Sequence, residues 1–285
     1  MAQSMQATKR RIKSISATKK ITNAMELVAT SKLKRSKDTL QGVKGYTDEI
    51  LNMVSTILSK KIDTDSPYLT NKEGLGTLYI VTTSTLGLCG GYNSNALKEF
   101  MKVFDKEKDQ LIVLGQKGTS YFTHRNIKIL ASFNEDSTGK EYSLSKQVSN
   151  LCLKMYSEQK ISKVSLVYTR FVNSVVFDPC IIDLLPVNKS DFKEVKQTAT
   201  SKDTLFEPNA NEIINKLIPM YFEATIYGRL VESHVSEQAS RRMAMENATD
   251  NASDLIDKLQ LQYNKARQSA ITQEISEVVG GANAL

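Results

Sequence analysis

Apolar residues recur at helical spacing along both ends of this chain, whereas its middle holds short apolar runs separated by turns. Over residues 5–58 the apolar positions follow steps of three and four without a proline. They do so again over 209–279, interrupted only by Pro219 and Gly228. Such steps place apolar side chains on one stripe of an α-helix. Two long terminal helices around a compact middle predict an antiparallel two-helix coiled coil that carries a globular head.

The apolar stripe of the first helix is thin in its first half, where Thr22, Ala29 and Ser36 replace large residues. Small side chains allow a partner helix to approach closely. Gly42 and Gly45 weaken the helix, since each glycine costs about 1 kcal/mol relative to alanine. The stripe consists of Ile12, Ile15, Thr22, Met25, Ala29, Ser36, Leu40, Val43, Ile50, Val54 and Ile57.

The second helix shows the alternating steps of four and three that are typical of a coiled-coil seam. A start near Glu207-Pro208-Asn209 is predicted, and Pro219 is expected to kink the helix. Gln238, Arg242 and Thr249 interrupt the seam with polar side chains. Its apolar and small members are Leu217, Tyr221, Ala224, Gly228, Val231, Val235, Met245, Ala252, Ile256, Leu259, Tyr263, Ala266 and Ala270.

The two helices differ in length, so one should extend beyond the other. Helices of about 55 and about 70 residues span roughly 80 and 105 Å. If the head joins them at one end, the second helix overshoots the first by about 15 to 20 residues. The overshoot falls over 267–285 and carries Ile271, Ile275, Val278 and Val279. A lone helix this short is marginal in water, so we expect a protein sleeve around it.

The middle of the chain alternates strand-like and helix-like segments, which predicts a Rossmann-like α/β head with a largely parallel sheet and an antiparallel edge. The predicted division is a first helix over 1–60, a head over 75–186, a polar linker over 187–207 and a second helix over 208–285. Strands are expected at 77–83, 110–115, 163–171 and 175–185, and helices at 93–104, 117–123 and 144–157.

Composition and charge narrow the function classes. Hydrophobic residues make up 40% and charged residues 24% of the 285, as in ordinary folded proteins. Three scattered cysteines form no C-x-x-C pair, which disfavours a disulfide framework or a zinc site. No apolar run approaches the length of a membrane span. The first 37 residues hold ten of the chain's Lys and Arg residues against Glu26 alone. Nucleic-acid binding and a mitochondrial presequence are two interpretations of this segment; an acidic protein partner is the favoured one.

Glycine-rich turns follow two predicted strands, at 87–91 and 115–118. A phosphate-binding loop would lie at the first of them, but neither has the spacing G-x-G-x-x-G or a following G-K-[ST]. Tight structural turns are the favoured interpretation. His124 and His234 are far apart, and His234 is expected at the surface or in the seam. We find no nucleophile, paired-carboxylate or metal motif and predict no catalytic residue, no cofactor and no metal.

Several long motifs resemble those of the gamma subunit of the F-type ATP synthase, in the family's order and over the whole chain. The opening helix is similar over 11–15 and 20–32, and the first turn over 87–91 with Asn93. Similar motifs in the second helix lie at 236–241, 248–252, 263–268, 271–277 and 281–282. A chain that starts directly at the helix resembles bacterial forms rather than precursors with a presequence.

The resemblance implies a central rotor shaft that couples ion flow through a membrane c-ring to conformational change in catalytic beta subunits, and that is not itself catalytic. The implied partners are an alpha3beta3 hexamer, the epsilon subunit and the c-ring, without nucleic acid or a transmembrane segment. The implied location is peripheral, on the cytoplasmic face of the cell membrane. By position, Lys20 and Met25 correspond to contacts with acidic loops of beta, and Arg267, Gln268 and Thr272 to contacts at the helix tip.

Some residues depart from the family pattern. Ser84-Thr85-Leu86 stands where the family has Ser-Asp-Arg, and Arg242 stands where an apolar residue is common. The cysteine-bearing redox insertion of chloroplast forms is missing, so thiol regulation is not expected. The alternatives are a divergent F1-like rotary ATPase, a coiled-coil scaffold or nucleic-acid binder, and a nucleotide-using α/β enzyme. Whether H⁺ or Na⁺ is the coupling ion stays open.

Overall fold

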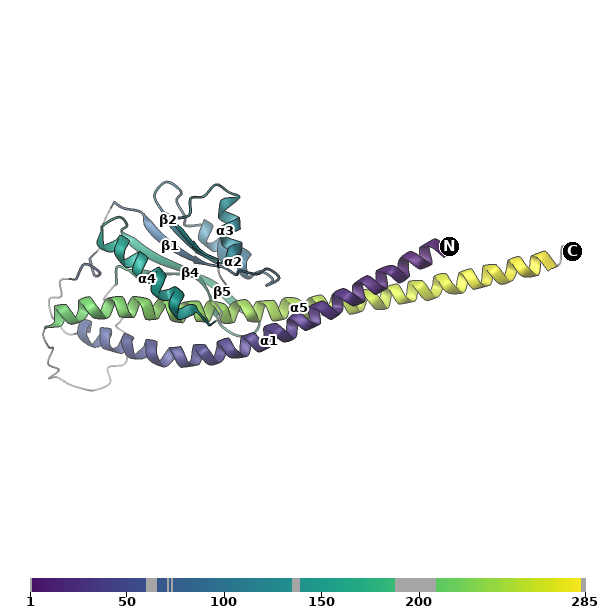
Figure 1. The fold of residues 1–285 in the computed structure, drawn as a ribbon, viewed down its shortest axis with the longest axis horizontal. Helices are drawn as coiled ribbons and strands as arrows, with labels where there is room; N and C mark the ends of the chain where they lie inside the picture. Colours follow the sequence, from purple (N-terminus) through teal and green to yellow (C-terminus); the bar gives the residue numbers. More distant parts are fainter. Residues whose placement is uncertain are drawn as a thin grey trace. The chain divides into compact units, whose positions relative to one another are not determined.

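The two ends of the chain form its two longest helices, as predicted: α1 (Ala2–Ser59) and α5 (Ala210–Ala282) (Figure 1). The computed structural model describes residues 2–59, 66–70, 72, 74–134, 139–187 and 209–282. It divides into two compact units, one of Met1–Ser31 with Arg241–Leu285 and one of Lys32–Ser240. We call them the helix pair and the head unit. Each long helix contributes a segment to both.

The head unit is built on one sheet of order β3-β2-β1-β4-β5. The first four strands of this order are parallel, and β5 pairs antiparallel with β4 at the edge, as predicted. The order 3-2-1-4 is that of a Rossmann-type sheet. The strands are β1 (Thr77–Thr82), β2 (Gln110–Leu114), β3 (Ala131–Phe133), β4 (Lys163–Phe171) and β5 (Phe177–Leu185); the shorter helices are α2 (Tyr92–Met101), α3 (Gln116–Thr123) and α4 (Glu141–Ser157).

Several boundaries and one strand differ from the sequence prediction. Strand β3 was not expected, because Ala131–Phe133 is too short to show an apolar run. Strand β5 begins at Phe177 rather than at residue 175, since Val175 and Val176 lie in a turn closed by Asn173. Val187, placed in the predicted linker, is buried and donates its N–H to the Tyr68 carbonyl. The remainder of that linker lies outside the described residues.

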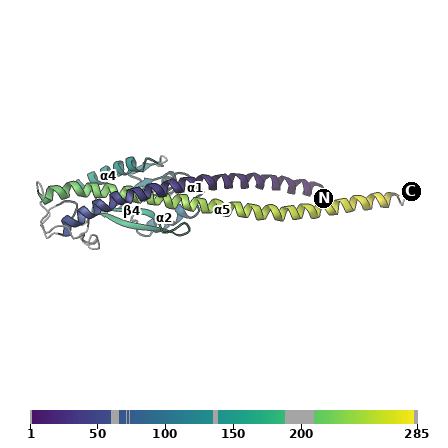
Figure 2. The same ribbon diagram turned by 90° about the horizontal axis from the view of Figure 1, so that it is seen from below.

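The two faces of the sheet bury different elements, because successive strand residues point to opposite sides. On one face, Ile80, Ile112 and Leu166 join a core with α4 and with residues of the head unit from α1 and α5. On the other face, Tyr79, Val81 and Leu111 pack with Phe100 of α2 and Phe122 of α3. The two long helices therefore form part of the main core of the head unit. Figure 2 shows this arrangement from a second direction.

Helix α5 begins with a side-chain cap and then runs without a break. Asn209 accepts the Glu212 N–H at 2.8 Å and donates to the Glu212 carboxylate at 3.1 Å, which satisfies free groups of the first turn. The helix continues through Pro219 and Gly228. Gly228 leaves room for Thr47 and Val43 of α1, which would lie 3.5 and 3.8 Å from an added Cβ. The predicted seam is confirmed here, where Ala224, Val231 and Val235 are buried. The kink at Pro219 stays a prediction.

Removing the Phe222 side chain should destabilise the head unit strongly. Phe222 is fully buried in the main core, so Phe222→Ala should lower the free energy of unfolding by about 3–5 kcal/mol. Met220 lies two residues away on the same helix and is 49% exposed. Met220→Ala should therefore change the free energy of unfolding by less than about 0.5 kcal/mol. Urea unfolding of the two variants and the wild type measures both values. Equal losses would show that this face of α5 is not the packed one.

Candidate functional site

The candidate interaction surface lies on the helix pair, where all five predicted contact residues are found. Its two helices run antiparallel with a fixed register. The hydroxyl groups of Thr22 and Thr249 lie 2.8 Å apart across the seam, and Thr22 is 9% exposed. Ala29, Ala252 and Leu259 are buried farther along the same seam. Threonine and alanine at facing positions let the helix backbones approach closely, as the thin stripe predicted.

The seam becomes shallower toward the ends of the helix pair. Ile12 and Ile15 of α1 are only half-buried, as are Tyr263 and Ala266 of α5. Buried apolar area is the main source of stabilisation between helices in water. The outer turns of the pair therefore hold each other less strongly than the turns around Ala29.

The predicted contact residues form two separate groups on this surface. Lys20 is exposed and Met25 is half-buried, next to the Thr22 contact. Arg267, Gln268 and Thr272 are exposed, and the Thr272 hydroxyl donates to the Gln268 carbonyl at 2.9 Å. With Thr22 opposite Thr249, Lys20 lies opposite about residue 251, so the groups are roughly 24 Å apart along the axis. The two groups can serve two contacts but not one shared site.

The last turns of α5 extend past the beginning of α1. The same register places residue 2 opposite about residue 269, so later residues have no neighbour from α1. Ile271, Ile275, Val278 and Val279 are 48%, 58%, 68% and 53% exposed. The predicted overshoot is confirmed, and it leaves an apolar helix tip in solvent.

Sequence reasoning missed a second apolar surface on α1. Ile21, Leu27 and Val28 are 61%, 65% and 57% exposed and lie off the seam. The available signal was spacing: Ile21, Ala24 and Val28 repeat in steps of three and four, each one position before a seam residue. Contiguous exposed apolar surface marks interaction sites in soluble proteins. The middle of the helix pair therefore offers apolar contacts as well as charge.

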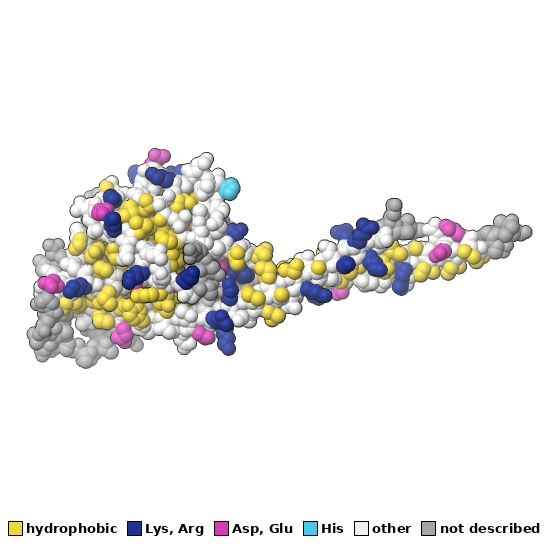
Figure 3. Space-filling model, in the orientation of Figure 1, with side chains coloured by type: hydrophobic (Ala, Val, Ile, Leu, Met, Phe, Trp, Pro, Cys, Tyr) yellow, Lys and Arg dark blue, Asp and Glu magenta, His cyan; other side chains and the backbone are white. Residues whose placement is uncertain are grey.

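The α1 segment of the helix pair is strongly basic, whereas the α5 segment carries charges of both signs. Basic side chains gather along it in Figure 3, and most belong to the first 20 residues of α1 (Figure 3). Helix α5 carries exposed acids at Asp250, Asp254 and Asp257. Arg242, the departure noted in the sequence, forms an ion pair with Glu246 of its own helix at 2.9 Å. The cation is thus accommodated at the edge of the seam without needing a buried counter-charge.

In the second glycine turn of the head unit, a side chain of the protein occupies the space where a ligand would bind. Gly115 has φ +99°, and an added Cβ would lie 2.2 Å from the Thr83 carbonyl oxygen. The Gly118 N–H, at the start of α3, donates to the Thr83 hydroxyl at 2.9 Å. In a phosphate-binding loop this N–H would face the ligand. Thr83 occupies that position, which agrees with the structural interpretation of the turn.

The first glycine turn is closed by Ser84 and Asn93. The Ser84 hydroxyl donates to the Leu86 carbonyl at 2.6 Å and accepts from the Asn93 amide at 2.7 Å. Ser84 is fully buried, whereas Leu86 is 64% exposed. The turn Ser84-Thr85-Leu86 is thus hydrogen-bonded, and it holds Thr85 and Leu86 at the two positions where the family pattern has an acid and a base.

His234 lies inside the head unit, so of its two expected positions, the surface and the seam, the surface is excluded. It is 7% exposed, and its Nδ1 lies 3.5 Å from the Glu141 carboxylate of α4. Its Nε2 lies 3.2 Å from the Gln238 amide nitrogen. The polar neighbours explain how a histidine fits between packed helices. His124 is exposed at the end of α3.

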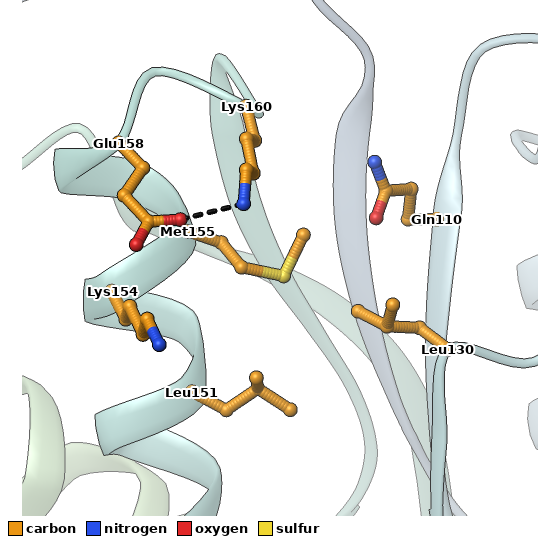
Figure 4. A pocket seen from close by; sticks show the side chains of 7 residues that line it. All are labelled: Gln110, Leu130, Leu151, Lys154, Met155, Glu158 and Lys160. Carbon is orange, nitrogen blue, oxygen red and sulfur yellow. Dashed lines mark ion pairs between the residues drawn. The ribbon is translucent and has the colours of Figure 1, made fainter.

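A shallow pocket of about 480 Å³ lies between α4 and the beginning of β2 (Figure 4). Leu130, Leu151 and Met155 form its floor, and Glu158 and Lys160 pair across its rim at 2.7 Å. The Glu158 carboxylate and the Lys160 ammonium neutralise each other, and the floor of the pocket is apolar. The lining therefore has no convergent set of catalytic groups.

The described residues contain no cluster of three His, Cys, Asp or Glu side chains that could bind a metal ion. Among the same residues, no helix has the length and apolar character of a membrane span.

Comparisons with known proteins place the chain among rotary ATP synthases. The family model described as ATP synthase matches residues 4–285. The ATP synthase gamma chain of Alkaliphilus metalliredigens is 39% identical and that of Mycoplasma mycoides 42%, covering 100% and 98% of both chains. The sodium ion specific gamma chain of Acetobacterium woodii is 36% identical over 100% of both.

Solved structures agree with the fold. The central stalk and c-ring structure of the Tetrahymena thermophila mitochondrial ATP synthase contains a chain with a TM-score of 0.58 and 26% identity; the match covers 80% of this chain and 99% of that one. A rotor chain of the Euglena gracilis enzyme has a TM-score of 0.67 and covers 95% of this chain and 100% of its own. At 17% identity, the latter likeness concerns the fold alone.

A methyl group at Gly115 should destabilise the head unit more than one at Gly139. Both glycines have positive φ, at +99° and +79°, but only the Cβ at position 115 would clash with backbone. Gly139→Ala should cost about 1–2 kcal/mol from conformational strain. Gly115→Ala should cost about 3 kcal/mol or more, because the clash adds to the strain. Chemical unfolding of both variants measures the difference. Equal costs would mean that Thr83 moves aside freely and that the turn is not tightly packed.

Proposed function

This chain belongs to the ATP synthase gamma chain family, and we propose from that premise that it is the central rotor shaft of a rotary F1Fo enzyme. It is a structural subunit of the rotor, and the catalytic step takes place on other subunits of the complex. The observation that carries the proposal is a full-length family match on a chain whose two ends form one antiparallel helix pair with an exposed apolar tip.

The helix pair is suited to turn inside a ring of alpha and beta subunits. Its two sides differ: α1 presents cations and the apolar residues Ile21, Leu27 and Val28, whereas α5 presents charges of both signs, the acids Asp250, Asp254 and Asp257 and the cations Lys258, Lys265 and Arg267. A shaft whose faces differ presents a different surface to each of three surrounding catalytic sites at any moment. Rotation driven by ion flow through the c-ring would then change the three sites in turn.

We assign the two groups of predicted residues to two heights of the hexamer. Lys20 and Met25 would contact acidic loops of beta, supported by the exposure of Lys20 and the half-exposed Met25. Arg267, Gln268 and Thr272 would contact the surrounding sleeve, supported by their exposure where the first helix ends. The apolar tip beyond them would be covered by the same sleeve, because exposed apolar surface is favourably buried against a partner.

The proposed partners are the alpha3beta3 hexamer, the epsilon subunit and the c-ring, and the proposed location is the cytoplasmic face of the cell membrane. The proposed division for this role is a first helix over 1–60, a head over 75–186, a linker over 187–207 and a second helix over 208–285. The coupling ion is H⁺ or Na⁺; a relative with 36% identity carries a sodium-specific name.

Co-expression of this chain with the alpha, beta, epsilon and c subunits of its own source tests the proposal. Purification through a tag on beta should recover the chain in a complex that hydrolyses ATP and pumps ions in vesicles. A chain that forms no complex with alpha and beta, or one that is dispensable for pumping, would overturn the proposal.

Adding a cation at Met25 should weaken coupling. In the proposed complex, Met25→Lys would form a charge-assisted hydrogen bond with a beta carboxylate in some rotary positions but not in others. Such a bond raises the barrier between positions, so ATP hydrolysis should persist while the ratio of pumping to hydrolysis falls at least about twofold. Met25→Leu keeps the apolar character of the side chain without the charge and should behave as wild type. The ratio is measured in vesicles; equal ratios for the two variants would place Met25 away from a carboxylate.

A further inference from the structure

Helices α4 and α5 meet in the head unit through a buried histidine as well as through apolar side chains (Figure 1). Val148 of α4 shares the main core with Phe222 and Ile226 of α5. At the first turn of α4 the contact is polar, because the Glu141 carboxylate lies 3.5 Å from the Nδ1 atom of His234. The side chains of His234 and Glu141 are 8% and 12% exposed, so water screens their interaction little.

Gln238 fixes the position of the proton on the His234 ring. Its amide nitrogen lies 3.2 Å from His234 Nε2 and 3.3 Å from a carboxylate oxygen of Glu237. An amide nitrogen donates and does not accept, so Nε2 is the acceptor and carries no proton. The neutral ring then holds its proton on Nδ1, which faces Glu141. Both ring nitrogens therefore have a partner in the neutral state.

The same Gln238 side chain holds an unused acceptor. Gln238 is 3% exposed, and its Oε1 atom is buried without a hydrogen-bond partner among the residues that the structure describes. An unpaired buried acceptor is unfavourable, because it has lost water without gaining a donor. Half a turn of the amide about its last side-chain bond exchanges the oxygen and the nitrogen, and this exchange would bring Oε1 to His234 Nε2.

We propose that His234, Glu141 and Gln238 form a proton-sensitive latch between α4 and α5. A proton from solvent binds to Nε2, so the ring becomes a cation and both of its nitrogens become donors. The Gln238 amide then turns, its Oε1 accepts the Nε2 proton, and its bond to Glu237 is lost. At Nδ1, the contact with Glu141 becomes an ion pair. The latch thus holds α4 more tightly against α5 at acid pH than at alkaline pH.

Other charged and titratable groups on the elements around the latch are Lys37 of α1, Tyr92 of α2, and Glu232 and Arg241 of α5. The first three are engaged with the Phe171 ring, the Ser233 hydroxyl and the Arg229 guanidinium, at 5.0, 2.8 and 2.9 Å. The Arg241 backbone lies about 10 Å farther along α5 than that of His234. The Glu141 carboxylate is the charge in contact with the ring, and it favours the protonated form.

A double-mutant cycle on the full chain tests the ion pair. Urea unfolding at about pH 5.5 and about pH 8.5 is measured for wild type, Glu141→Gln, His234→Gln and the double variant. The coupling between the two positions, expressed as a ratio of unfolding equilibrium constants, should be at least about fivefold larger at the lower pH. The sign follows because the ring and the carboxylate attract as opposite charges only after the ring has taken up a proton.

The matched control is a cycle of Arg170→Gln and Asp178→Asn. These two residues form an ion pair at 2.7 Å in the same head unit. Their coupling should be equal at the two pH values, because arginine and aspartate side chains ordinarily keep their charges over this range. A coupling between His234 and Glu141 that is equally constant would overturn the proposal.

The rotation of the Gln238 amide is measured by NMR of the full chain. His124→Gln leaves His234 as the single histidine, since the sequence holds two. The side-chain amide signals of Gln238 should shift with the same pH midpoint as the His234 ring signals. A ring that does not titrate between about pH 5 and 8.5, or an amide that stays unchanged while the ring titrates, would sink the proposal. This measurement keeps the latch intact, so it decides the question even where a variant of the cycle fails to fold.

The latch goes beyond the proposed function and does not depend on it. Both measurements use the chain alone, whereas assembly with alpha and beta subunits tests the rotor role. A chain that assembles but shows no pH-dependent coupling would keep the proposed function and lose the latch. A chain that shows the coupling but forms no complex would do the reverse.

Discussion

The contact on which the head unit depends is the burial of α5 against the sheet and against α1. Ile218, Phe222 and Ile226 of α5 are fully buried in the same core as Ile80 and Leu166 of the sheet. Val54 and Ile57 of α1 close this core from the other end of the chain. The central α/β segment therefore lacks a complete core without residues of both long helices. A force applied to the sheet is passed directly to both long helices.

Small polar residues make the close approach of α5 to the sheet possible. The Ser233 hydroxyl lies 2.8 Å from the Tyr92 hydroxyl and 3.1 Å from that of Thr82, and it accepts the Thr169 N–H at 3.3 Å. Burial raises the pKa of Tyr92, so its phenol stays protonated and available as a donor. Further along, the Ser240 hydroxyl donates to the Cys89 carbonyl at 2.7 Å. These bonds fix the rotation of α5 on the sheet, which apolar packing alone would leave less specific.

Much of this arrangement could be predicted from the sequence, because it depends on regular spacing. The seam residues Val231 and Val235 and the stripe residues Val43, Ile50 and Val54 are buried as expected.

Prediction failed where local chemistry outweighed the pattern. Val175 and Val176 have strand propensity, but the Asn173 side chain bonds their N–H groups and holds them in a turn. For His234 the choice between a surface and a seam position stayed open, because its neighbour in space, Glu141, lies far away in sequence. For the predicted contact residues, their positions on the helix pair could be anticipated, whereas their partners belong to other chains.

The helix pair and the head unit are stabilised to different degrees, and this difference suits a rotor. In the head unit, α1 contributes Ile50, Val54 and Ile57, which are at most 5% exposed. In the helix pair, the facing residues include Thr22 and Ala29, which bury much less apolar area per side chain. The outer seam is half-buried, and the tip of α5 is exposed from Ile271 to Val279. A helix pair that buried all of its apolar side chains internally would leave little apolar surface for contacts with surrounding subunits. Here the apolar side chains left unburied on α1 and at the tip are available to a surrounding sleeve, so the head transmits torque while the pair keeps its binding surface for its partners.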